Sequence, residues 1–224
     1  MEPIPRTIQV KDNQLLIIDY AKPEEQKEVL EFLELHFYPK SPICYLTNDG
    51  LIDDKRDEFT SQCLESRVSL TVRDSAGNLV AIRLNKLESK GPLSFFSKAS
   101  AKNDSFILSL LGGLEEDIDV FTRYNTDKVL SLGLVAVDQQ YGRLGLASIL
   151  IKITMELARM NGAGAIKATV VSEYAARAFT KLGFETLRTI EYVDFEYNGE
   201  KSLANKMNLL NEHTRARFMA RHLM

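Results

Sequence analysis

The stretch that most constrains the fold of this chain covers residues 128–184. It begins with an apolar run of strand length, passes through a polar turn that carries a glycine, and continues into an amphipathic helix. A second β-rich run and a further helix complete it. The order strand, turn, helix, strand, helix predicts a βαβ unit followed by one more helix. We expect these elements at residues 129–137, 138–143, 146–160, 165–171 and 172–183.

The helix expected at residues 146–160 has one apolar face, because its large apolar side chains recur at helical spacings. Asn161 and Gly162 follow it directly, and both residue types are common where helices end. The expected face comprises Leu146, Ile149, Leu150, Ile153, Leu157 and Met160.

The turn before this helix has a chemical use. A strand that enters a helix through a turn without bulky side chains exposes backbone N–H groups at the helix N-terminus, where the helix dipole also attracts anions. Gly145 permits close approach of a ligand to the backbone, and Gly142 permits an unusual φ. A diphosphate fits such a site. In the alternative interpretation, the glycines only shape the turn of a βαβ unit.

The same turn resembles the acetyl-CoA pyrophosphate loop of the GNAT superfamily of N-acetyltransferases. That pattern is Gln or Arg, two residues, Gly, one residue, then Gly or Ala. Gly145 and Ala147 match the last two fixed positions, whereas the first falls on Gly142 and an arginine, Arg143, stands one place later. The resemblance implies that the backbone of this loop binds the diphosphate of acetyl-CoA. The implied binding residues are Gly142, Arg143, Leu144, Gly145, Leu146, Ala147 and Ser148.

A second signature of this family lies at residues 172–184, at the family's usual separation from the first. The closing helix of the family reads Asn-x-x-Ala and ends in Leu-Gly-Phe. This chain matches it at Ala175, Lys181, Leu182, Gly183 and Phe184.

The remaining segments extend the resemblance to the arylalkylamine N-acetyltransferases, in their invertebrate form. It covers nearly the whole chain, so we expect a single domain over residues 1–224. Turn residues at 74–78 predict a hairpin between two strands. We expect strands at residues 15–18, 68–72, 79–84 and 214–223, helices at residues 23–37, 53–66 and 106–121, a break at residues 38–42 and an exposed loop at residues 86–104.

Composition excludes several other classes of protein. The chain has 45% hydrophobic and 26% charged residues, as globular proteins do, and its net charge of -3 argues against a nucleic-acid partner. No apolar run is long enough to span a membrane, and the N-terminus does not resemble a secretory signal. Its two cysteines, Cys44 and Cys63, are too few for a disulfide framework or a metal site. A cytoplasmic location is therefore the default expectation.

The resemblance implies a mixed α/β fold, with a twisted mixed sheet of about seven strands and helices on both faces. Two central parallel strands splay apart in this fold, and here they correspond to residues 132–137 and 167–171. The pantetheine of acetyl-CoA lies in the gap as an added strand would. The implied contacts include the backbone of Val135, Ala136 and Val137, which is placed to polarise the thioester carbonyl.

The side chains that transfer protons depart from the family pattern. In the invertebrate branch the base is a glutamate in Asp-Glu-Pro-Leu, and Ser41 occupies that place here. Two helper serines of the branch fall on Val171 and Ala175. The tyrosine that protonates the leaving thiolate in many family members falls on Phe179. Phe179 is therefore expected to line the cofactor site without taking part in proton transfer.

Three further residues are candidates for the missing chemistry, each with a simpler alternative. Tyr174 has a phenol in the closing helix, although it could equally be a packed or surface tyrosine. Ser172 takes the place of the helix-capping asparagine, and capping alone would explain it. His36 ends the first long helix near the expected acceptor site, where a histidine can also simply stabilise a helix C-terminus. With Ser41, they are the catalytic candidates. His213 is a weaker candidate, because a loop position would explain it.

Two functions remain open. The first is an acetyl-CoA-dependent N-acetyltransferase that acts on a small primary amine, with arylalkylamines among the candidates and no metal required. The second is an acyl-CoA-binding protein of the same fold with weak or no catalysis. A dinucleotide-binding domain is disfavoured because the loop lacks G-x-G-x-x-G. The sequence names neither the amine nor the oligomeric state.

Overall fold

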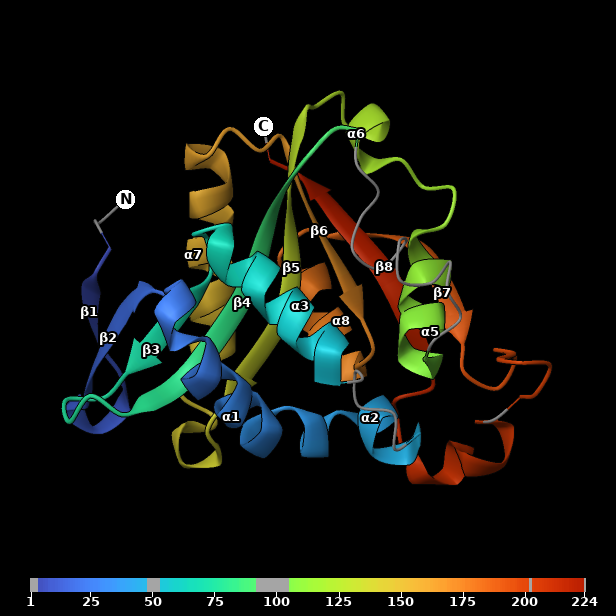
Figure 1. Ribbon diagram of the computed structural model, residues 1–224, viewed down its shortest axis with the longest axis horizontal. Coiled ribbons are helices and arrows are strands. Elements are labelled where there is room, and N and C mark those ends of the chain that lie inside the picture. Colours follow the sequence, from blue (N-terminus) through green and yellow to red (C-terminus); the bar gives the residue numbers. More distant parts are fainter. Residues whose placement is uncertain (1–3, 48–52, 92–104, 202, 224) are drawn as a thin grey trace.

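The computed structural model describes residues 4–47, 53–91, 105–201 and 203–223, which form one eight-stranded sheet with helices on both faces (Figure 1). The strands are β1 (Arg6–Gln9), β2 (Leu15–Tyr20), β3 (Leu70–Arg73), β4 (Leu79–Ser89), β5 (Lys128–Val137), β6 (Ala165–Val170), β7 (Glu185–Glu191) and β8 (Arg215–His222). The helices are α1 (Gln26–His36), α2 (Pro42–Thr47), α3 (Asp53–Glu65), α5 (Phe106–Glu115), α6 (Val120–Arg123), α7 (Leu146–Met160) and α8 (Glu173–Lys181).

The sheet has the strand order β1-β2-β3-β4-β5-β6-β8-β7. β5 and β6 are parallel, and every other neighbouring pair is antiparallel. This mixed sheet confirms the predicted fold class. The local pattern does not predict β1 or β7, because these edge strands contain no fully buried side chain and so carry little hydrophobic signal.

Helices cover the two faces of the sheet unequally (Figure 1). On one face, α1, α3 and α5 pack into a large core against β4 and β8; its helical members include Leu33, Cys63 and Leu108, each completely buried. On the other face, α7 and α8 pack against the central strands.

α7 crosses the middle of the sheet and carries two apolar stripes rather than one. Leu150 and Leu157 pack toward β2, β3 and β4, while Ile151 and Met155 pack toward β5 and β6. The expected apolar face is correct except at its end, where Met160 is 66% exposed. Met160 is the last residue of α7. Its side chain extends past the strands that pack against the rest of this face.

Two expected elements differ in the structure. The helix expected at residues 106–121 divides into α5 and α6, because Asp117 takes a positive φ of 57° and Asp119 caps α6, accepting hydrogen bonds from the backbone N–H groups of Phe121 and Thr122. The exposed loop expected from residue 86 begins later, since β4 continues to Ser89 and pairs with Lys128 at the start of β5. Residues 92–104 of that loop lie outside the described residues.

The short helix α2 begins at residue 42, the last residue of the break expected at residues 38–42. Pro42 begins it, a position where proline loses no hydrogen bond. The break therefore leads directly from α1 into α2. The segment from Phe37 to Cys44 lines the cavity described below.

The parallel strands separate as predicted. Their pairing runs from Val129 with Ala165 to Leu132 with Ala168, whereas β5 itself continues to Val137. Beyond Leu132, the edge of β5 that faces β6 has no strand partner among the described residues. Backbone N–H and C=O groups at such an edge require another partner.

The other edge of β5 shows how the separation begins. Arg83 of β4 faces Val135, but Asn85 faces Leu132, so β5 contains one residue more than β4 in this interval. Such a bulge bends and twists a strand. Gly133 lies within it, and a Cβ atom there would stand 2.8 Å from Cζ of Phe59. The bulge thus turns the second half of β5 away from β6.

A buried ionic triad lies where the two strands are still paired. Lys167 of β6 places its Nζ atom 2.9 Å from Oε2 of Glu88 in β4 and 3.0 Å from Oε2 of Glu115 in α5. Burial lowers the pKa of the Lys167 ammonium, but the two carboxylates outweigh it and leave that pKa raised. The triad joins two strands and one helix.

Candidate functional site

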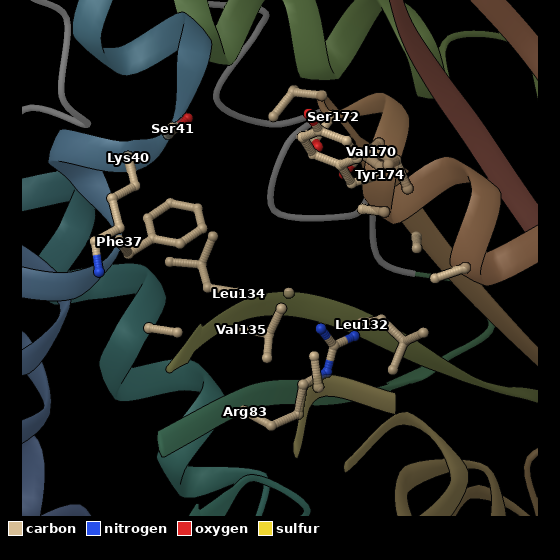
Figure 2. A pocket seen from close by; sticks show the side chains of 18 of the residues that line it. Phe37, Lys40, Ser41, Arg83, Leu132, Leu134, Val135, Val170, Ser172 and Tyr174 are labelled. Atoms are coloured by element: carbon tan, nitrogen blue, oxygen red, sulfur yellow. The ribbon is translucent and has the colours of Figure 1, made fainter. Parts of the chain in front are cut away.

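A cavity of about 500 Å³ lies at the gap between β5 and β6. It extends from the segment that joins α1 and α2, across the sheet, to α7 and α8 (Figure 2). Most of its lining is apolar, including Leu132, Leu134, Ile151 and Val170. The cavity therefore connects the two faces of the sheet at the point where the strands separate.

At one end of the cavity is the N-terminus of α7. Gly145 is its N-cap in the left-handed region, with φ 76°, and no side chain caps the helix. The first intrahelical bond joins the N–H of Ile149 to the carbonyl of Gly145 at 3.0 Å, so the preceding N–H groups have no intrahelical acceptor. Ala147 and Ser148 of this turn line the cavity. Together with the helix dipole, this end is suited to an anion.

The glycines of the loop act differently from the expectation. Gly142 has an ordinary φ of −59°, and the unusual φ of 62° belongs to Arg143. Gly142 is required by space instead, since a Cβ atom there would stand 2.9 Å from the carbonyl oxygen of Gln139. At Gly145, in contrast, a Cβ atom would meet nothing within 4 Å. Its surroundings are open to a ligand.

Side chains of the loop point away from this open space or into solvent. Leu146 is 2% exposed, and it and the half-buried Leu144 belong to the core beneath α7. Arg143 is exposed. Gly142, Arg143, Leu144, Gly145 and Leu146 do not line the cavity as described, whereas Ala147 and Ser148 do. Any contact of the first five with a ligand would be made at the cavity mouth.

The free edge of β5 forms one side of the cavity. Val135, Ala136 and Val137 line it, and so do residues of β6 across the gap. Phe179 of α8 also lines the cavity; it is 5% exposed and packs edge-to-face on Phe184 with ring centroids 4.8 Å apart. The β5 backbone and the Phe179 ring therefore offer this part of the cavity hydrogen bonds and apolar contacts.

The four candidate catalytic residues all line this cavity. His36 and Ser41 stand on the wall formed by α1 and α2, while Ser172 and Tyr174 stand on the wall formed by α8. Figure 2 shows Ser41 across the cavity from Ser172 and Tyr174. The structure therefore brings the four together, although residues 36 and 174 are far apart in the sequence.

Ser41 is 6% exposed, and its Oγ atom has no hydrogen-bond partner in the described part of the chain. The phenol of Tyr38 nearby is also buried without a partner there, and burial raises its pKa. No base among the described residues therefore contacts Ser41. His36, the last residue of α1, is half-buried with its ring 4.4 Å from the ring of Phe32.

At α8 the expected capping interaction is absent. Ser172 is the N-cap residue by backbone position, but its side chain makes no capping hydrogen bond. The N–H of Glu173 donates instead to Nδ1 of His213 at 3.2 Å. A histidine forty residues later in the chain thus replaces the serine, and His213 also lines the cavity. No local sequence pattern predicts this contact.

Tyr174 is a poor proton donor in this arrangement. It is 63% exposed and packs edge-to-face on His213, with ring centroids 5.0 Å apart. The carboxylate of Glu212 accepts its hydrogen bond and raises the pKa of the phenol. Because a raised pKa means a more tightly held proton, Tyr174 stands at the cavity mouth as a hydrogen-bonding group.

One polar residue of the lining, Arg83, was not predicted from the sequence. It lies within an apolar strand segment, and a charged residue between buried neighbours is the signal that could have identified it. It is only 2% exposed.

Residues 93–184 match the Acetyltransferase (GNAT) family. Over these residues the chain is similar to a GNAT acetyltransferase domain. The matched residues include the loop at the N-terminus of α7, both strands of the gap and the closing helix α8.

Solved structures extend the similarity of the GNAT fold to almost the whole chain. Arylalkylamine N-acetyltransferase 2 from Aedes aegypti has a TM-score of 0.80 at 21% identity, over 93% of this chain and 99% of that one. The Drosophila melanogaster polyamine N-acetyltransferase, an enzyme that catalyses the formation of N-acetylagmatine, has a TM-score of 0.77 at 20% identity, over 92% and 99%. More distant is Arabidopsis thaliana NAA60 in complex with acetyl-CoA, with a TM-score of 0.55 at 12% identity, over 92% and 98%.

Metal-binding clusters and membrane-spanning helices are both absent from the described residues. Within the described ranges, no cluster of three or more His, Cys, Asp or Glu side chains could hold a metal ion. Among the same residues, no helix combines the length and apolarity that a bilayer crossing demands.

Proposed function

We propose that this GNAT domain is an acetyl-CoA-dependent N-acyltransferase whose acceptor is a small primary amine. The observation that carries the proposal is the continuous cavity. It joins an uncapped helix N-terminus to an unpaired strand edge and then to a separate, partly polar wall. A long donor and a small acceptor would enter such a cavity from opposite faces of the sheet.

The donor would use the α7 end of the cavity. Its diphosphate would accept hydrogen bonds from the free N–H groups between Arg143 and Ser148, where the helix dipole favours negative charge. Its pantetheine amides would pair with the unpaired edge of β5 beyond Leu132. The same backbone, at Val135 to Val137, would polarise the thioester carbonyl.

The acceptor would use the wall formed by α1 and α2. The names of the solved neighbours support a small amine, since they act on arylalkylamines and form N-acetylagmatine. The cavity supports the same class because its volume of about 500 Å³ suits a compact ligand. Cys44 and His36 stand on this wall with Ser41.

Removal of the ammonium proton is the step for which this chain lacks the usual group. Ser41 is a poor base without an activating neighbour. Water or His36 would take the proton before the amine nitrogen attacks the carbonyl carbon. The C–S bond then breaks, and the nitrogen loses its second proton to solvent. The thiolate takes its proton from solvent, because Phe179 has no proton to give and Tyr174 holds its own tightly.

The pH dependence of the rate distinguishes the two routes. A primary amine has a pKa near 10.4, as a lysine does, so without a base the rate rises about tenfold per pH unit through neutrality. A rate that levels off between about pH 6 and 7.5 indicates a titrating base. Loss of that plateau in His36→Gln would assign it to His36, and its persistence would exclude both routes.

A second function is favoured by one observation: neither Ser41 nor Phe179 can transfer protons as the family resemblance requires. The chain would then bind acyl-CoA with weak or no turnover. Release of CoA thiol from acetyl-CoA, measured against arylethylamines, polyamines and amino acids, separates the two. Amine-dependent release supports the transferase. Tight acetyl-CoA binding by calorimetry without release for any amine supports the binding protein and overturns the first proposal.

A further inference from the structure

Arg83 is a buried cation without a counter-ion among the described residues. Its side chain is 2% exposed, and its Nε atom donates to Oδ1 of Asn85 at 3.1 Å. One terminal nitrogen of its guanidinium is buried with no hydrogen-bond partner in the described part of the chain. No acidic side chain in the described ranges forms an ion pair with it. A buried polar group of this kind requires an explanation.

The guanidinium lies at the bulge of β5 and borders the cavity. Arg83 faces Val135 across the strand pair, and its bond to Asn85 directs the side chain toward the position opposite Leu132. Figure 2 shows the guanidinium between Leu132 and Val135, reaching toward the cavity. Asn85 in turn donates to Oγ1 of Thr154 in α7 at 3.3 Å. The free N–H groups are therefore held where the strands separate, on the side of the sheet that α7 covers.

A comparison with Lys167 shows how unusual this is. Both residues are buried cations of the central sheet, but Lys167 has two carboxylates within 3.0 Å. Burial of Arg83 lowers its pKa to about 9, and nothing in its described surroundings outweighs that effect. The side chain is still a cation at neutral pH. An unpaired buried charge of this kind is unfavourable unless a partner joins it. The cavity is where such a partner can enter.

The chemistry of that partner follows from the guanidinium and its surroundings. A guanidinium presents parallel N–H groups that match the two oxygens of a carboxylate. The neighbouring lining from Leu132, Val135 and Ile151 is apolar and offers no other charge. The phosphates of a CoA donor are accounted for at the N-terminus of α7 in the proposed function. The missing partner is therefore a second, smaller anion.

We propose that the cavity takes a substrate that carries a carboxylate, and that Arg83 is the counter-ion of that carboxylate. This proposal rests on the proposed acyl transfer and names its substrate class. The carboxylate would be carried either by the acyl chain, as in malonyl-CoA or succinyl-CoA, or by the acceptor, as in an amino acid. In both cases the ammonium first loses one proton to solvent, and the C–N bond forms as the C–S bond breaks. The nitrogen then loses its second proton, the CoA thiolate takes up one proton, and the carboxylate itself is unchanged.

The test compares substrates that differ mainly in the carboxylate. In the donor arm, succinyl-CoA is compared with butyryl-CoA on one amine. In the acceptor arm, tyrosine is compared with tyramine and arginine with agmatine, using acetyl-CoA. We expect a kcat/KM at least about tenfold higher for the carboxylate-bearing member in one arm, which identifies the source. The preference should fall below about twofold in Arg83→Met and Arg83→Gln, and survive in part in Arg83→Lys.

Arg188→Met is the matched control, because that arginine donates to the carbonyl of Gly113 at 2.7 Å and does not line the cavity. It should keep the parent preference. Equal kcat/KM values within every pair in the parent protein would overturn the proposal, whatever the variants do. So would a preference that remains in Arg83→Met.

Binding of the same compounds by calorimetry, with free CoA present for the acceptors, is the second readout. If no pair shows turnover, the proposed transferase function fails. The inference is still supported if the carboxylate-bearing member of a pair binds more tightly and this difference is lost in Arg83→Met. Equal binding of both members overturns it.

Discussion

The buried triad of Lys167, Glu88 and Glu115 leads to a quantitative prediction for stability. The side chains are 6%, 12% and 5% exposed, and both N–O distances are 3.0 Å or less. Lys167→Met removes the cation but leaves two buried carboxylates that face each other. Removing one partner of a buried pair costs about 3–5 kcal/mol. In a chain of this size, each kcal/mol corresponds to about 2–4 °C, so we expect Tm to fall by roughly 6–20 °C at pH 7.

The pH dependence gives the prediction its sign. In the parent, the raised pKa of Lys167 means that its contribution is fully present below the ordinary lysine value of about 10.4 and is lost only as pH rises through the folded-state value. Lys167→Met lacks this group, so the deficit relative to the parent should be largest below the ordinary lysine value and should shrink as pH rises above it.

Urea unfolding of the parent and variant at pH 7 and at about pH 11, above the ordinary lysine value, measures this difference. The control is Lys167→Met combined with Glu88→Gln and Glu115→Gln, which removes all three charges. It should recover most of the lost stability, since replacing a whole buried ion network is often neutral. The reasoning is refuted if Lys167→Met lies within about 1 kcal/mol of the parent at pH 7. A deficit that is equal at both pH values, or that remains in the triple variant, also refutes it.

Three further predictions concern the cavity. Gly145→Glu should abolish acetyl-CoA binding, measured by calorimetry. Gly162→Glu is the control, because Gly162 has the same φ of 76° and equally open surroundings at the other end of α7, and it should bind as the parent does. Equal binding by both variants would show that the diphosphate does not bind at Gly145. Gly133→Ala should lower stability by about 1–3 kcal/mol, because its Cβ atom would stand 2.8 Å from a ring carbon of Phe59; unchanged thermal unfolding would mean that the ring moves freely. Ser41→Glu should raise kcat/KM at neutral pH and flatten the pH–rate slope; an unaltered slope would remove this position from the acceptor site.

The elements from β5 to α8 could be predicted because their signals are local. An apolar run of strand length, helical spacing of apolar residues and the turn residues after them are each complete within a few neighbours. The loop proposed to bind the cofactor belongs to the same class, since a helix N-terminus binds anions through its own backbone. Residues 129–137 and the start of α7 at Leu146 therefore agree with the structure almost residue for residue.

Predictions failed where a distant partner decides the conformation. The end of β4 was expected to belong to a loop at residues 86–104, because that stretch has Gly91, Pro92 and four lysines. Pairing with β5 and the bond from Glu88 to Lys167 make residues 86–89 part of a strand. The helix expected at residues 106–121 failed for a local reason instead, since Asp119 caps α6 by accepting hydrogen bonds from the N–H groups of Phe121 and Thr122. Ser172 was expected to cap α8, and His213 does so instead.

The sequence by itself determined the order of the elements from β5 to α8, because that order depends on residue type and short spacing. The loop proposed to bind the cofactor and the replacements at Ser41 and Phe179 were likewise inferred from the sequence. The tertiary structure alone decided that His36, Ser41, Ser172 and Tyr174 line one cavity and that Arg83 borders it without a counter-ion from the described residues. Burial and charge pairing are sums over neighbours from many parts of the chain. A strand pattern shows that residue 83 lies among apolar residues, but only the folded sheet shows that no carboxylate of the described residues forms an ion pair with it.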